Sequence, residues 1–187
     1  MRFVLNREKA AQAAAYLVKL HGGQINLMAL IKLLYLADRT ALIETGFPIT
    51  GDQMVSMPHG PVLSQIYDSA KWEIESDPWN SYISERTGHE VSLVNGNPSR
   101  GELSDYEIRV LEGVHSEFGH MNQFKLRDLT HDLPEWRDPQ GSSLPIDPLT
   151  ILRAAGRSDE DIAQLSQQSE ELFFLHNLLH RHPISVR

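Results

Sequence analysis

Apolar residues between positions 27 and 45 recur at the spacing of an α-helix that is buried on nearly all sides. They follow the i, i+3, i+4, i+7 pattern of one helical face, and further leucines widen that face. The members are Leu27, Leu30, Ile31, Leu33, Leu34 and Leu36. Gly46 stands where a left-handed helix stop belongs, and Pro48 prevents the helix from continuing. We therefore predict a central helix that other elements cover on both sides.

The stretch after this helix predicts a short strand, a sharp corner and a further helix. Met54–Met57 suits extended structure, and the sequence HGPV at 59–62 predicts the corner. Pro61 suits the first position of a helix, where its missing N–H costs nothing. We therefore predict that the next helix runs from Val62 to Trp72.

Five other segments have helical periodicity and recognisable starts. Ser104 and Glu107 have the spacing of a capping box, and Asn122, Asp147 and Ser158 suit N-cap positions. The predicted helices cover residues 7–21, 105–118 and 123–131, a short segment from 148, and a long one from 159.

Polar and apolar residues alternate weakly on both sides of Thr87-Gly88, over residues 82–86 and 89–94, which predicts a small hairpin. The chain is therefore expected to be mainly α: a single compact domain of about seven helices with a small β-hairpin element.

Composition divides the chain into three expected parts. Residues 1–137 should form a helical core with the small β element, and residues 138–148 a Pro/Gly/Ser connector. Residues 149–187 should form C-terminal helices that pack on the core. The apolar seam of the last helix is typical of core packing, although helices after a flexible connector also dock partners. The seam consists of Ile162, Leu165, Leu172, His176 and Leu179, with Phe173 beside it.

The overall charge is acidic. With 25 acidic and 17 basic side chains, the net charge of −8 disfavours nucleic acid and anionic membranes and favours a basic partner. Among 187 residues there is no cysteine, which excludes disulfides, thiolate catalysis and cysteine–zinc sites. No apolar run reaches the roughly 18 residues of a membrane span, and the N-terminal sequence lacks the apolar region of a secretory signal. We expect a cytoplasmic protein.

Histidines offer the main candidates for chemistry. His59 lies in a Gly-Pro corner that would hold a general base rigidly, but no Ser/His/Asp order or nucleophile elbow accompanies it. His115, His120, His131 and Asp132 invite a metal interpretation, yet their spacing matches no helical two-histidine motif. There is no glycine-rich phosphate loop. We expect neither a metal nor a cofactor.

Asp38 and Arg39 lie late in the apolar central helix, where a buried charge must be paired. The structural interpretation is a bridge from Asp38 to the Gly60-Pro61 corner or to an arginine. The functional alternative is a pocket shared by Tyr35, Asp38, His59 and His131, which would make the protein an enzyme.

A second alternative is a DNA-binding transcriptional regulator. The predicted helices between residues 105 and 131, joined by a short turn, have the layout of a helix-turn-helix. The second helix would present Gln123, Lys125, Arg127 and Asp128 to the groove. The acidic composition and the scattered basic residues weigh against this interpretation.

Three motifs carry a resemblance to a known family: KLLYLAD at 32–38, MPHGPVLSQIYD at 57–68 and LTHDLPEWRDP at 129–139. In this order and spacing they resemble the Panacea domain of SocA-like antitoxins and phage-associated proteins. The C-terminal helices also resemble the tail of SocA-like members. The motif positions, whose roles the resemblance does not define, are Lys32, Leu33, Tyr35, Asp38, His59, Gly60, Pro61, Val62, Tyr67, His131 and Trp136.

The resemblance implies the antitoxin of a toxin–antitoxin pair, which neutralises a separately encoded protein toxin by direct contact. Delivery of the toxin to a protease is a variant of the same role. The toxin gene is expected beside that of this chain. The resemblance carries no catalytic residues, so we do not expect an enzyme.

Stable neutralisation needs on the order of 800 Å² per partner, with aromatic side chains as the main anchors. The candidates for an exposed aromatic patch are Trp72, Trp79, Tyr82 and Trp136.

Overall fold

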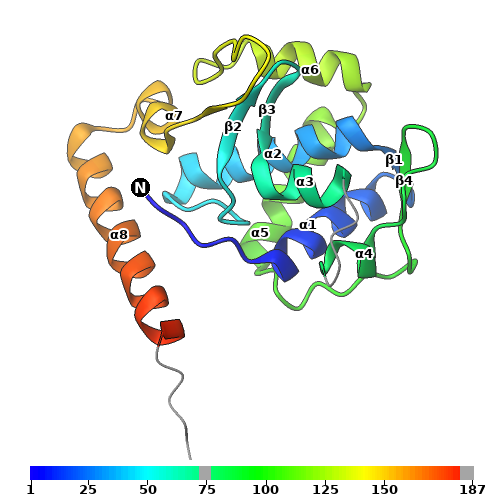
Figure 1. The fold of residues 1–187 in the computed structure, drawn as a ribbon, viewed down its shortest axis with the longest axis horizontal. Helices are drawn as coiled ribbons and strands as arrows, with labels where there is room; N and C mark the ends of the chain where they lie inside the picture. The colour runs from blue at the N-terminus through cyan, green and yellow to red at the C-terminus, as the bar shows by residue number, and fades with distance from the viewer. Residues whose placement is uncertain (72–76, 182–187) are drawn as a thin grey trace, which may run out of the picture.

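The protein is organised around helix α2 (Leu27–Thr45), as the sequence predicts. The computed structural model describes residues 1–71 and 77–181 (Figure 1). The Asn26 side chain caps the first turn of α2, and Gly46 ends it with a φ of 85°. The residues from Ala29 to Asp38 form an unbroken buried run. A helix buried on all sides must satisfy each of its polar side chains inside the protein.

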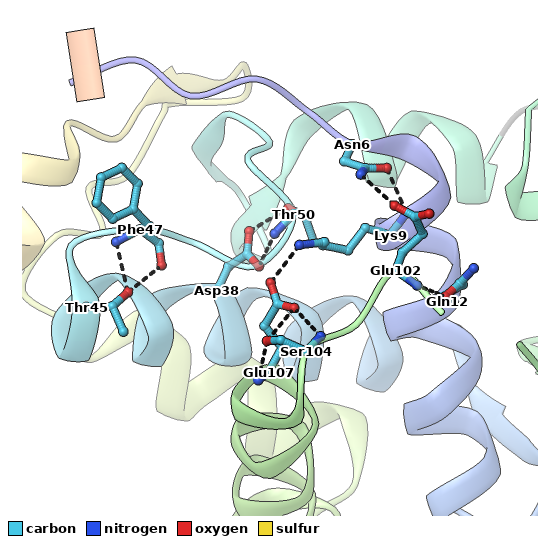
Figure 2. Close-up of polar contacts among 10 residues, drawn as sticks. All are labelled: Asn6, Lys9, Gln12, Asp38, Thr45, Phe47, Thr50, Glu102, Ser104 and Glu107. Atoms are coloured by element: carbon cyan, nitrogen blue, oxygen red, sulfur yellow. Dashed lines mark hydrogen bonds and ion pairs between the residues drawn. The ribbon is translucent and has the colours of Figure 1, made fainter. Parts of the chain in front are cut away.

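Five helices of the described residues pack against α2: α1 (Arg7–Leu20), α3 (Ser64–Lys71), α5 (Asp105–Phe118), α6 (Gln123–His131) and α7 (Pro148–Ala154). The alanine-rich face of α1 is fully buried and permits close approach to its neighbours. Local signals fix the helix starts, because the predicted capping box of Ser104 and Glu107 is present (Figure 2). Lys9 of α1 donates to the Glu107 carboxylate at 2.8 Å, which joins α1 to the start of α5.

Strands β2 (Met54–Met57) and β3 (Gly60–Leu63) form a hairpin with a two-residue turn. The prediction that Pro61 and Val62 begin a helix is wrong: both lie in β3, and α3 covers Ser64–Lys71. Pro61 is tolerated because β3 is an edge strand and because Pro61 faces Ser56 at a position whose N–H points away from β2. The predicted helix end at Trp72 lies outside the described residues.

Strand β5 (Leu144–Pro145) pairs with the other edge of β2, so the predicted connector contributes a third strand. A second sheet pairs β1 (Gln24–Asn26) with β4 (Glu90–Ser92). The hairpin predicted over residues 82–94 is therefore only partly correct. It is reduced to isolated bridges, because the buried pair of Ile25 and Val91 directs β4 to β1.

A one-turn helix, α4 (Trp79–Tyr82), and the long α8 (Asp159–Arg181) bring the helices of the described residues to eight. The prediction of a mainly α, compact fold with a small β element is confirmed. Arg157, between α7 and α8, donates to the carbonyl oxygens of Ile43 and Glu44 at the end of α2. None of the helices in the described part of the chain is long and apolar enough to cross a membrane.

The apolar seam of α8 is buried only in its first half. Ile162 is 5% exposed, and Leu165 contacts the turn at Gly46. Farther along the helix, Leu172 and Leu179 are 50% and 65% exposed. The seam is therefore not a continuous core element.

Gly60, in the β2–β3 hairpin, should tolerate substitution poorly. Its φ is 92°, and an added Cβ would lie 2.8 Å from both Lys32 Nζ and Thr130 Oγ1. We expect Gly60→Ala to lower the free energy of unfolding by about 2–4 kcal/mol, from left-handed strain and overpacking. Gly88→Ala is the matched control, because Gly88 also has a positive φ but no atom of the described residues within 4 Å of an added Cβ. Urea unfolding that gives equal losses for the two variants would contradict this packing.

Candidate functional site

Lys32 joins α2 to the β2–β3 hairpin. The side chain is 1% exposed, and Nζ donates to the carbonyl oxygen of Pro61 at 2.8 Å. Burial lowers the pKa of Lys32 to about 7. Gly60 makes this approach possible, because any side chain there would meet the amine. The motif positions Lys32, Gly60 and Pro61 thus form one contact between helix and hairpin.

Tyr35 and Arg39 of α2 share one carboxylate, that of Glu135. The Tyr35 hydroxyl donates to Glu135 Oε1 at 2.8 Å, and Arg39 Nε donates to the same oxygen at 2.6 Å. Glu135 is 4% exposed and the Arg39 side chain is 19% exposed, so a buried carboxylate pairs with a partly buried guanidinium and a phenol. Burial, reinforced by the carboxylate, raises the pKa of Tyr35 and keeps it a donor. The sequence interpretation missed Glu135, although a partly buried arginine indicates a carboxylate partner somewhere in the chain.

Asp38 binds Thr50 rather than the Gly60-Pro61 corner or an arginine, which corrects the predicted bridge. The Thr50 amide donates to Oδ1 at 3.0 Å and its hydroxyl donates to Oδ2 at 2.5 Å (Figure 2). Asp38 is fully buried, and burial raises its pKa to about 7. The contact fixes the loop that follows α2.

Around the turn of the β2–β3 hairpin lies a partly exposed cluster, the hairpin-tip surface, made of Pro58, His59, His131 and Trp136. His131 stacks on Trp136 with ring centroids 4.2 Å apart. Trp136 Nε1 donates to the carbonyl oxygen of Met57 at 3.1 Å. Burial lowers the pKa of His131, and its buried Nε2 has no hydrogen-bond partner among the described residues. His59 is exposed in the turn.

The four members of the hypothetical shared pocket therefore separate into two groups. His59 and His131 both lie at the hairpin tip, whereas Tyr35 and Asp38 are engaged with Glu135 and Thr50. Leu33 and Val62 are buried core residues, and Tyr67 is half-buried beneath Lys71. Most of the motif positions thus hold the fold together.

Several of the residues considered for metal and DNA binding have structural partners. Within residues 1–71 and 77–181 there is no group of three or more potential ligands that could hold a metal ion. His115 packs edge-on against His21. On α6, Arg127 pairs with the carboxylate of Asp128 at 2.6 Å, which reduces its availability for phosphate.

The predicted aromatic patch is only partly exposed. Trp79 is 4% exposed because α4 packs under α1, so its placement on an open surface was wrong. Tyr82 is half-buried and contacts Glu8 and Gln12 of α1, and Trp136 is half-buried at the hairpin tip. Trp72 lies outside the described residues.

Most of the exposed large apolar side chains in the described part of the chain lie in the second half of α8, the helix whose apolar seam the sequence suggested as core or as a docking face. Five large apolar side chains there are between 46% and 65% exposed. We call them the α8 apolar face: Leu172, Phe174, Leu175, Leu178 and Leu179. In the sequence, the run LFFLHNLL at 172–179 indicates such a face, because its apolar residues cover more of the helix circumference than one buried seam needs.

Residues 30–137 match the family model described as antitoxin SocA-like, Panacea domain. The match covers more than half of the chain and runs from α2 through Glu135 and Trp136, and it ends before α7 and α8. No curated protein and no solved structure matches the chain.

Lys32→Met should change how stability depends on pH. The pKa of Lys32 is lower in the folded protein, about 7, than the ordinary 10.5. The unfolded chain therefore binds more protons between these values, and Lys32 makes the folded protein more stable as pH rises. Urea unfolding gives the free energy of unfolding of Lys32→Met and of the wild type at each pH. The value for the variant minus the value for the wild type should be higher at pH 6 than at pH 9. Lys19→Met, at an exposed lysine, is the control; the same pH response in both variants would contradict this assignment.

Asp38→Asn should reveal the opposite dependence. Because its pKa rises to about 7 from 3.8, the folded protein binds more protons between these values. The stability contributed by Asp38 is therefore present below pH 4 and is lost as pH rises through 7. The wild type should lose stability relative to Asp38→Asn between pH 4 and 7, measured by urea unfolding. Asp132→Asn, at an exposed carboxylate, should show no such trend.

Proposed function

This chain belongs to the family of SocA-like antitoxins with a Panacea domain, and from this membership we propose that it neutralises a cognate protein toxin by binding it directly. The family match is the observation that carries the proposal. The toxin is a separate protein, expected to be encoded beside this chain.

The use of the motif side chains supports a binding role. Polar side chains of α2 form hydrogen bonds with other parts of the same chain. They include Lys32, Tyr35, Asp38 and Arg39. These groups maintain the fold, so recognition falls to the outer surface.

The charge of the chain supports a basic partner. A net charge of −8 repels nucleic acid but attracts proteins that themselves bind nucleic acid or ribosomes. Complementary charge also accelerates association, which suits a protein that must capture a toxin before the toxin acts.

Neutralisation would use a folded surface. The C-terminal part of the chain is helical through Arg181, and Arg157 fixes its start to α2. A preformed helix loses less conformational entropy on binding than a disordered tail.

The proposal is tested by co-expression with the adjacent reading frame. We expect the neighbour to arrest growth alone, this chain to restore growth, and the two proteins to co-purify in a fixed ratio. A version of this chain with an early stop codon controls for gene dosage and should not restore growth. A neighbour that is harmless alone and does not co-purify with this chain would refute the proposal.

A further inference from the structure

The second half of α8 exposes more apolar surface than the fold requires. The exposed side chains fall in two neighbouring stripes, because Leu172, Leu175 and Leu179 follow i, i+3, i+7 spacing and Phe174 and Leu178 follow i, i+4. The buried Ile162 and Ser169 and the partly buried Phe173 share the other side of the helix. Contiguous exposed apolar side chains of this kind mark interaction sites, whereas single exposed leucines do not.

The N-terminal segment lies against α8 beside the α8 apolar face. Arg2 pairs with the Glu170 carboxylate, and its guanidinium carbon lies 4.6 Å from the centroid of the Phe173 ring. A hollow of about 360 Å³ opens beside this contact and is lined by Arg2, Phe173, Phe174, Asn177 and Leu178. Figure 1 shows α8 along one side of the molecule, apart from the central helices, so that a partner can reach it.

The charged side chains of α8 before Arg181 are all acidic. Between Asp159 and Leu179 the helix has five carboxylates and no lysine or arginine. Glu171 is exposed within the apolar face, one turn before Leu175. The face thus combines leucine and phenylalanine anchors with negative charge, which fits an apolar groove with basic side chains at its rim. A second copy of this chain fits less well, because it would bring the same carboxylates together.

We propose that the α8 apolar face is the toxin-binding surface, and that it lies as a helix in an apolar, basic-rimmed groove of the toxin. This assignment rests on the proposed antitoxin function. It places recognition outside residues 30–137, the part of the chain that matches the family model. The family-matched part then serves as the scaffold on which α8 is displayed.

The test uses the full chain, the purified product of the adjacent reading frame and a pair of matched variants. Phe174→Ala with Leu178→Ala truncates the α8 apolar face, and alanine preserves the helix. Phe124→Ala with Leu144→Ala is the control, because these residues are 54% and 43% exposed on α6 and β5. We expect the α8 variant to bind at least about 100-fold more weakly, since each anchor of this kind contributes a factor of roughly 30. It should also fail to restore growth, with an unchanged thermal unfolding midpoint, while the control binds like the wild type.

A charge variant gives a second measurement. Glu171→Lys should slow association with the same protein at low salt, and the difference should shrink as salt screens the charges. Asp105→Lys, at an exposed acid at the start of α5, makes the same change of charge away from the face and should slow association clearly less than Glu171→Lys.

Three outcomes would overturn the inference. The first is wild-type affinity in the α8 double variant, with the toxin still bound. The second is loss of binding in the Phe124/Leu144 control instead. The third is a wild-type dimer that the α8 double variant converts to monomer without loss of toxin binding, which would assign the face to self-association. If the wild-type chain does not bind the neighbour at all, the proposed antitoxin function itself fails, so the two failures are distinguishable.

Discussion

The fold depends on one constraint: a helix buried along ten consecutive residues also carries a lysine, a tyrosine and an aspartate. Each buried polar group needs a partner inside the protein, because leaving one unpaired costs on the order of 1–3 kcal/mol, and more for a charge. Lys32 donates a hydrogen bond to the hairpin, Tyr35 donates one to Glu135, and Asp38 accepts one from the loop after α2. The central helix therefore determines where three separate segments must lie.

The parts of the fold that depend on neighbours in sequence could be predicted, and those that depend on distant pairing could not. Capping residues such as Ser104 and Asn122 act within one helical turn, and both were identified correctly. Pro61 fits a helix start and an edge strand equally well, and only its pairing opposite Ser56 decides between them.

The same distinction applies to the site residues. The sequence indicated that Asp38 and Arg39 require partners, but it could not show that these are Thr50 and Glu135. Trp79 is of a residue type that often anchors interfaces, but it is buried because α4 packs under α1. The exposed run on α8 was visible in the sequence, but only the limited contact of α8 with the body shows that it is not core.

The partnership of Tyr35 and Arg39 with Glu135 has a consequence for the ribosome-bound chain. The two partners are separated by 100 and 96 residues, so α2 leaves the ribosome long before its carboxylate does. Because chains emerge from the N-terminus at a limited rate, the nascent protein holds an apolar helix with an unmatched cation while 96 further residues are synthesised. The domain thus completes its interior only when translation has passed the third motif, and it matures late rather than segment by segment.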